Sequence, residues 1–441
     1  MGGASAVSAE NLRRHLRVLT EEIGVRLAGG EGERSAAAYI ADEGRRCGAE
    51  VRIEPFPVRQ RDVTAERVEI QMGGVWKSFP CSLFSNTPGT GGVPVEAPLV
   101  FFEAPTEYRR PDLGHLKGRA VVHLGSHIES REHYRRLIAA EPAFLMFVDI
   151  RYPGSVPLAD GMFPEYTRAI GALPTVNVAY QDAWQWHTDG ATAARLTVHG
   201  GMRDSESSNV IIDLPGDGDE WIVVGGHHDT QADSIGADDN GTGVIAVLEL
   251  ARVLAGQRRQ RGIRLISFGA EEQLSVGSAV YVRRHREAVQ QYTRFMWNID
   301  SIGSHMGWTD LIVNGSDAMA DWLVARFEER DLWVAPRRAV NPYADHFPFV
   351  AAGIPSAFLI RPNCVAGRFF HHRPDDDMSR VSFDLVARIL DTSASFLETL
   401  ATCPELPFPR TVDPELAAQA RVYWEDLFGG WNPSGRAASG R

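Results

Sequence analysis

Apolar residues recur along the chain with two different periods, and the change of period divides it into parts. Between residues 9 and 46 they recur at near-helical spacing, with an interruption at Gly29-Gly30. This pattern predicts helices on either side of the two glycines. A short run with the composition of a strand, Glu50–Phe56, follows. We therefore expect the chain to begin with helices and an edge strand.

The region from about 59 to 200 has a different pattern, in which short apolar runs are separated by Pro and Gly. The runs are Val68–Met72, Leu99–Phe102, Ala120–Leu124, Ala143–Val148 and Thr175–Val178. Short strands with turn residues between them are typical of a β-rich module. We interpret this region as an insertion, a kind of unit that often covers a site.

From Asn209 onward, strand-like runs alternate with helix-like segments. The expected strands are Trp221–Gly225, Ile263–Phe268, Phe295–Ile299 and Ser356–Ile360, and the expected helices are Gly243–Leu254 and Ala318–Glu329. Such alternation predicts an α/β fold, with a mixed, mostly parallel sheet and helices on both faces.

These patterns suggest a division of the chain. The main domain is expected to comprise residues 1–58 and 201–405, and the β-rich insertion residues 59–200. Residues 406–441 are expected to form a C-terminal tail. Its last ten residues, rich in Gly and Ser, are predicted to be disordered.

The charge of the chain limits the partners it can have. It carries 57 acidic and 45 basic residues, for a net charge of −12. Binding to a phosphate backbone needs clustered Lys and Arg, and no basic run with interleaved aromatic residues is present. We therefore expect no nucleic-acid partner, and we ascribe part of the acidic excess to carboxylates around metal ions.

The cellular location is predicted from three features of the sequence. No run of 18 apolar residues occurs, so we expect no membrane span. The first residues lack the apolar stretch of a secretory signal. The cysteines Cys47, Cys81, Cys364 and Cys403 lie far apart without C-x-x-C spacing, which favours isolated reduced thiols over a disulfide framework or a thiolate zinc site. Together these features predict a cytoplasmic protein.

Acidic residues and histidines follow several of the expected strands. The segments are WIVVGGHHDT, ISFGAEEQ and MWNIDSIG at the ends of strands, GADDNGTG at the start of a helix, and FFHHRPDDD after the last strand. Each segment alone is ordinary: a polar surface loop, or a helix cap made by Asp and Asn. Sites in open α/β sheets form at the carboxyl ends of strands, where these segments are expected to meet.

The chemistry of these side chains indicates metal ions. Histidine and carboxylate ligands without cysteine suit zinc or manganese. A carboxylate shared by two ions allows them to lie about 3.5–4 Å apart. The sequence thus predicts a site for two adjacent divalent metal ions.

The stretch from Trp221 to Val381 resembles the M28 family of zinc peptidases, which includes bacterial aminopeptidases and carboxypeptidase Q. The family pattern is H-x-D, G-A-D-D/N, E-E, a strand-end Asp and a distal His; this sequence has GGHHDT, GADDN, GAEE, NIDSIG and HHRPDDD in that order. The resemblance covers about 1–58 and 205–400. Residues 60–200 resemble a protease-associated domain more loosely, through GRAVVHLG and ALPTVNVAYQDA.

The resemblance implies a role for each matching position. The implied roles are His227 and Asp300 as ligands of one zinc ion, Glu272 and His372 as ligands of the other, Asp239 as the bridge between them, Glu271 as the general base, and Asp229 as the partner of the far nitrogen of His227. Glu271 would take a proton from a metal-bound water and deliver it to the leaving amine.

Two neighbouring positions depart from the family pattern. The aminopeptidases commonly have Tyr before the distal His, where this chain has His371. We predict that His371 stabilises the oxyanion in place of that hydroxyl. The spacing of H-x-P-x-D assigns the ligand role to His372. In YADHFPF, Ala344 replaces the usual Ser before Asp345-His346, to which we assign only a supporting role.

Several functions remain open on these motifs. The simplest is an aminopeptidase that acts on a peptide or small amide substrate. A carboxypeptidase, dipeptidase or other amidohydrolase would need a cation for the substrate carboxylate, and the candidates are Arg337, Arg338, Arg361 and Arg368. A glutaminyl cyclase is less favoured, since those enzymes hold one zinc. A non-catalytic, receptor-like relative is disfavoured because every ligand position is filled.

Overall fold

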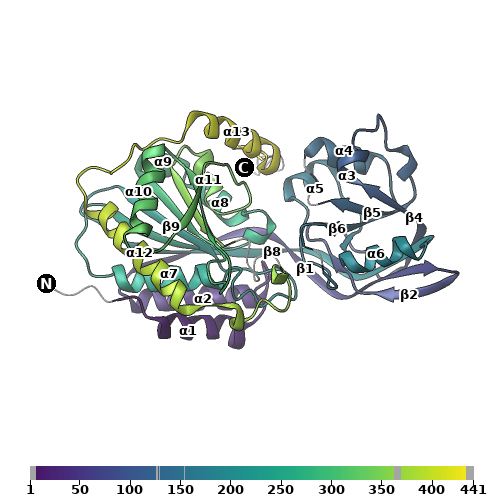
Figure 1. Cartoon of the computed structure of the whole chain (residues 1–441), viewed down its shortest axis with the longest axis horizontal. Helices are drawn as coiled ribbons and strands as arrows, with labels where there is room; N and C mark the ends of the chain where they lie inside the picture. The colour runs from purple at the N-terminus through teal and green to yellow at the C-terminus, as the bar shows by residue number, and fades with distance from the viewer. Residues whose placement is uncertain (1–5, 126–127, 129, 153, 362–368, 434–441) are drawn as a thin grey trace, which may run out of the picture. The chain divides into compact units, whose positions relative to one another are not determined.

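The computed structural model describes residues 6–125, 128, 130–152, 154–361 and 369–433. The chain divides into two compact units (Figure 1). One comprises Met1–Val58 and Ser205–Trp424, and the other comprises Arg59–Asp204 and Glu425–Arg441. The strands β1 (Glu50–Met72) and β8 (Ala193–Leu214) each pass from one unit into the other.

The first unit is built on a mixed sheet. Its strands are β8, β9 (Trp221–His227), β10 (Gly262–Phe268), β11 (Thr293–Ile299), β12 (Thr309–Asn314), β13 (Val334–Arg337) and β14 (Ser356–Ile360), in the order β13-β12-β14-β11-β9-β10-β8. The central strands β10, β9, β11 and β14 run parallel, while β8 and β12 are antiparallel to their neighbours in this group.

Helices cover both faces of this sheet (Figure 1). On one face lie α1 (Ala9–Arg17), α2 (Glu31–Arg46), α7 (Gly241–Leu254), α10 (Asp317–Glu328) and α12 (Phe383–Thr402); on the other lie α8 (Val276–Arg284), α9 (Arg286–Tyr292) and α11 (Phe347–Ala351). The prediction of an α/β fold with helices on both faces is confirmed.

The helix α7 lies in the core of this unit. It lies between β9 and the helices α1, α2 and α12, so its side chains are buried on nearly every side. Its apolar residues form one core with those of the sheet. Trp297 of β11 packs edge-to-face against Phe396 of α12, with ring centroids 5.0 Å apart, a favourable arrangement for two aromatic rings. The start of α7 is therefore a fixed point on which a site can be built.

The second unit contains the other strands of the sheet, and it has its own core. The strands β4 (Val95–Glu103), β5 (Ala120–Gly125), β6 (Phe144–Asp149) and β7 (Thr175–Asn177) are parallel, with β3 (Ser82–Leu83) antiparallel at one end. The strand β2 (Val75–Phe79) pairs with β1. The unit also contains α3 (Ala104–Glu107), α4 (Arg131–Ala139), α5 (Pro164–Ile170) and α6 (Tyr180–Thr188), which the strand pattern did not predict. Its likeness to a protease-associated domain stays a prediction.

The segment expected as a tail contains a helix, α13 (Pro414–Phe428). Trp424 on this helix is 1% exposed, with its ring 6.2 Å from that of Phe347 and the guanidinium of Arg283 4.5 Å above it. These contacts anchor the helix to the first unit. Residues 434–441, most of the segment predicted to be disordered, lie outside the described residues.

Two further expectations concern the chain as a whole. Within the described ranges, no helix has both the length and the apolar composition needed to cross a membrane. Cys47, Cys81 and Cys403 are free, and Cys364 falls outside the described residues.

Candidate active site

Parallel strands bring the predicted site residues to one edge of the first unit's sheet. His227 is the last residue of β9, Asp300 follows β11 directly, and Glu271 follows β10 after a two-residue turn. Because β9 pairs in parallel with both β10 and β11, these strand ends lie side by side. Asp239 lies two residues before the first residue of α7, so the buried start of that helix holds it against the strand ends.

One group of potential metal ligands consists of His227, Asp239 and Asp300. The Nε2 atom of His227 lies 3.4 Å from Asp239 Oδ1 and 3.5 Å from Asp300 Oδ2. The ligand atoms of the three residues all lie within 4.8 Å of one another. His227 is fully buried, while Asp239 and Asp300 keep slight exposure. The three side chains therefore converge on a space that a single ion would fill.

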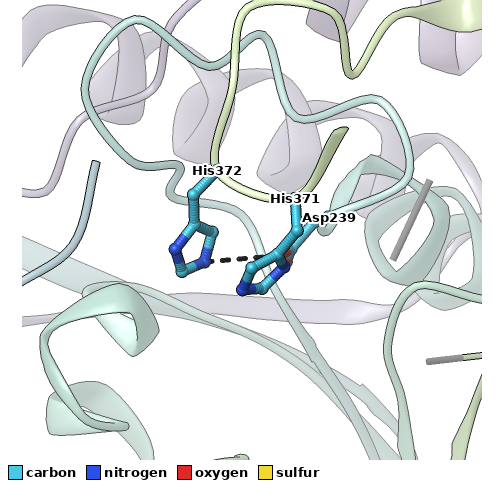
Figure 2. Close-up of side chains that lie close together, drawn as sticks. All are labelled: Asp239, His371 and His372. Carbon is cyan, nitrogen blue, oxygen red and sulfur yellow. Dashed lines mark ion pairs between the residues drawn. The ribbon is translucent and has the colours of Figure 1, made fainter. Parts of the chain in front are cut away.

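A second group lies on the other oxygen of Asp239 (Figure 2). His371 Nδ1 is 3.0 Å from Asp239 Oδ2, and His372 Nε2 is 3.5 Å from the same oxygen. His372 Nε2 also lies 2.9 Å from Glu272 Oε2. The two imidazole rings stack with their centroids 3.6 Å apart. Asp239 thus belongs to both groups, as a bridging carboxylate would.

The structure brings together every ligand that the resemblance implied. It also places His371 closer to Asp239 than His372 is, although the motif spacing assigned the ligand role to His372 alone. Because the rings are stacked side by side, both histidines can offer a nitrogen to the second group. The oxyanion role of His371 stays a prediction.

The electrostatics of the cluster fit a pair of cations. Burial raises the pKa values of Glu271 and Glu272 well above the ordinary range. Burial acts against protonation of His227, yet Asp300 and Glu271 outweigh it and raise the pKa of His227 well above its usual value. Nε2 of His227 has no hydrogen-bond partner. Crowded buried carboxylates around an unpartnered imidazole nitrogen are a donor set suited to zinc.

Asp229 acts on both the histidine and the glutamates of the site. Its Oδ1 lies 3.4 Å from Nδ1 of His227, and the same nitrogen hydrogen-bonds the backbone carbonyl of Asp229 at 3.2 Å. The same carboxylate accepts hydrogen bonds from the backbone N–H groups of Glu271, at 2.9 Å, and Glu272, at 3.1 Å. Asp229 therefore fixes the turn that carries the proposed base as well as the orientation of the imidazole.

Sequence reasoning missed other carboxylates that shape the site. Asp376 accepts hydrogen bonds from the backbone N–H groups of Asp238 and Asp239, both at 2.9 Å. Asp238 accepts one from the N–H of Gly303, at 2.7 Å, and so ties this loop to the segment after Asp300. Asp376 was part of the H-x-P-x-D spacing and Asp238 part of GADDN, so the motifs contained the signal without revealing the partners.

A buried arginine holds the loop between His227 and Asp239. Arg26 is fully buried and donates to carbonyl oxygens along the chain: those of Leu19, Gly24, His228, Ile235 and Gly236. Burial lowers the pKa of Arg26 to about 10, which leaves it charged near neutrality. Since it links both ends of the loop, Arg26 limits how far the bridging carboxylate can move.

The Asp345-His346 pair is buried next to the site. His346 stacks on Phe358, with ring centroids 5.0 Å apart, and burial lowers its pKa to about 3, so it is neutral at physiological pH. Burial also raises the pKa of Asp345 to about 7. Asp345 is close enough to Glu271 for its charge to help raise the pKa of that residue, and the supporting role of the pair stays a prediction.

Comparison with known proteins gives an independent view of this site. Residues 209–397 match the model of peptidase family M28, and this range contains every predicted ligand and the proposed base. The chain contains a peptidase family M28 domain. It is therefore a metal-dependent peptide hydrolase, and the family implies zinc.

The relatives of this M28 peptidase include aminopeptidases and carboxypeptidases. It is 26% identical to aminopeptidase YwaD of Bacillus subtilis over 431 residues, which cover 93% of this chain and 88% of that protein. It is 27% identical to carboxypeptidase Q of Rattus norvegicus over 229 residues, which cover 48% of this chain and 47% of that protein.

Solved structures share the fold over nearly the whole chain. A zinc aminopeptidase from Bacillus subtilis superposes with a TM-score of 0.73 at 21% identity, covering 93% of this chain and 99% of that one. A peptidase M28 precursor from Shewanella amazonensis gives a TM-score of 0.77 at 19% identity, covering 92% and 96%. Both units of the M28 peptidase thus have counterparts in proteins of the same architecture.

Proposed function

We propose that the protein is an aminopeptidase with two co-catalytic zinc ions, in which Glu271 is the general base. The observation that carries the proposal is the position of Asp239, whose two oxygens face two separate groups of ligands. One group holds His227 and Asp300, and the other holds His372 and Glu272, with His371 stacked on His372. Two zinc ions bound there would polarise the scissile carbonyl and acidify a water molecule.

The remaining chemistry belongs to side chains of the protein. Glu271 is buried beside the ligands, with Oε2 3.7 Å from Nε2 of His227. Burial raises the pKa of Glu271, which suits a group that must take a proton from water near neutral pH and return it to the leaving amine. His371, next to His372 in the second group, would stabilise the developing oxyanion by donating a hydrogen bond from its ring.

The negative charge of the site favours a substrate recognised by its free amino terminus over one recognised by its free carboxyl terminus. The cluster is rich in carboxylates that can hold a free ammonium group. Of the arginines considered for a substrate carboxylate, Arg361 is 6% exposed and donates to the carbonyls of Ser304 and Gly307. Arg337 pairs with Asp310 at 3.0 Å, and Arg338 pairs with Asp317 and Asp413. Arg368 lies outside the described residues.

The proposal is tested by the metal content of the protein and by the activity and metal content of two matched variants. We expect close to two zinc ions per chain and loss of activity on chelation. Glu271→Gln should keep both ions and lower kcat by about 10²-fold or more, since only the proton transfer is lost. Glu272→Gln should lose zinc instead. Full activity without metal, or equal loss of zinc in both variants, would contradict the proposal.

The substrate class needs a separate assay. We expect aminoacyl reporter substrates to be cleaved, and N-blocked reporters and C-terminal reporters to resist cleavage. Preferential cleavage of a reporter with a free carboxyl end would instead favour the carboxypeptidase alternative.

A further inference from the structure

The turn that carries Glu271 has an unusual backbone. Ala270, just before it, and Leu274 and Ser275, just after it, have positive φ values of 52°, 70° and 47°. Residues other than glycine rarely adopt this left-handed backbone conformation, because their Cβ atom comes too close to the backbone. A strained turn next to a catalytic group suggests that the surrounding contacts keep it in place for a purpose.

The hydroxyl of Ser275 makes a contact that the position of this residue, directly before α8, does not explain. It is the residue before α8, where a serine hydroxyl usually accepts a hydrogen bond from the first turn of the helix. In this conformation Ser275 makes no such side-chain cap. Its hydroxyl instead donates to Oε1 of Glu271 at 3.0 Å. Ser275 is fully buried, so water does not compete for this bond.

The bond gives the two oxygens of Glu271 different surroundings. Oε1 is held by the hydroxyl of Ser275, while Oε2 is the oxygen that lies 3.7 Å from Nε2 of His227. The backbone of the turn is also closed, because the N–H of Ser275 donates to the carbonyl of Glu271 at 2.6 Å. A carboxylate held through one oxygen cannot rotate freely, so its other oxygen stays directed at the ligands.

We propose that Ser275 is a positioning residue that holds Glu271 through Oε1 and keeps Oε2 facing the metal ligands. This inference rests on the proposed role of Glu271 as general base. It predicts that loss of the hydroxyl lowers kcat and leaves KM and zinc content unchanged, because the ligands and the substrate contacts remain in place.

Ser275→Gly is the discriminating variant because it removes the hydroxyl and also relieves the backbone. Glycine adopts φ near 47° without strain, which offsets part of the stability lost with the hydroxyl's buried hydrogen bond, so the variant should fold and bind zinc like the wild type. Its kcat should nevertheless fall about tenfold, as expected when a hydrogen bond to a charged group is lost. Ser275→Ala should show the same loss of kcat and a lower unfolding temperature than Ser275→Gly, because alanine keeps the backbone strain.

Two controls test whether a lower kcat comes from the lost positioning of Glu271 or from the change in backbone strain. Asp331 has φ 53° and is exposed, far along the sequence from the site ligands, so Asp331→Gly should relieve strain with no change in kcat. In a Glu271→Gln background, Ser275→Gly should cause no further loss of kcat, because the group it positions no longer acts as a base.

The outcomes distinguish this inference from the proposed function. A wild-type kcat for Ser275→Gly, a loss explained by missing zinc, or an equal loss in the Glu271→Gln background would each overturn the positioning role. If Glu271→Gln itself were fully active, the proposed function would fail first, and the inference with it.

Discussion

Asp376 offers a sharp test of how the bridging carboxylate is held. In Asp376→Asn, one carboxylate oxygen becomes an NH₂ group of nearly the same size. Since the two oxygens accept from the N–H groups of Asp238 and Asp239, at 2.9 Å each, the amide can satisfy only one of them. The other N–H then faces a donor. Losing a hydrogen bond to a charged acceptor costs about 1.5–3 kcal/mol.

This cost should appear mainly in zinc affinity, because the N–H groups belong to the loop that presents Asp239 to both ligand groups. Partners of this kind typically change metal affinity by about 10–100-fold. The assay is a competition between the protein and a chelator of known zinc affinity. Asp375→Asn is the matched control, since Asp375 is the exposed neighbour with the same change of charge. Equal zinc affinity in the two variants would refute the reasoning.

Further predictions concern three histidines. His372→Ala should lose zinc, whereas His371→Ala should keep both ions and lower kcat by about 10²-fold; zinc loss in His371→Ala with retention in His372→Ala would reverse the assignment. Burial lowers the pKa of His15 to about 4. Between about pH 4 and 6.5 the His15 imidazole is therefore more readily protonated in the unfolded chain than in the folded one. The free energy of unfolding should therefore fall by up to about 3 kcal/mol as the pH decreases through this window, with no further change below it. Urea unfolding at several pH values should show this loss in the wild type and a smaller one in His15→Gln.

The periodic signals in the sequence were strong enough to predict the main sheet. The runs Trp221–Gly225 and Phe295–Ile299 became β9 and β11, and Gly243–Leu254 lies within α7. These segments are buried on both sides, so their apolar residues leave little ambiguity. Their ends carry the ligands, which is why the candidate site was predictable together with the fold.

Other elements could not be predicted because their patterns are mixed. The helix α4 contains only two buried residues, Tyr134 and Leu137, and is identified chiefly by its cap, where Ser130 accepts from the N–H of His133. The helix α13 lies in a segment flanked by Pro and Gly, and its fixed position depends on contacts of Trp424 with residues distant in the sequence. Long-range packing of this kind leaves no periodic trace in the sequence.

The site shows a second limit of sequence reasoning: the sequence does not reveal which carboxylates face the ligand groups and which hold the backbone. Asp239, Glu272 and Asp300 face the ligand groups, whereas other carboxylates accept backbone N–H groups of the loops that carry them. Asp229 and Asp376 each accept two such groups, and Asp238 accepts one.

Glu33 belongs to this second class, although it lies far from every motif. It is 1% exposed and accepts from the N–H groups of Gly29 and Ala270 and from the hydroxyl of Ser207, so it ties its own segment and that of Ser207 to the turn that carries Glu271. Burial raises its pKa to about 8, a direction that its three donors oppose. A spacing motif records which acidic residues are present, but an acidic residue that binds a metal and one that binds backbone look the same in a sequence. Only the direction of each oxygen separates them, and here the second class fixes the geometry on which the first depends.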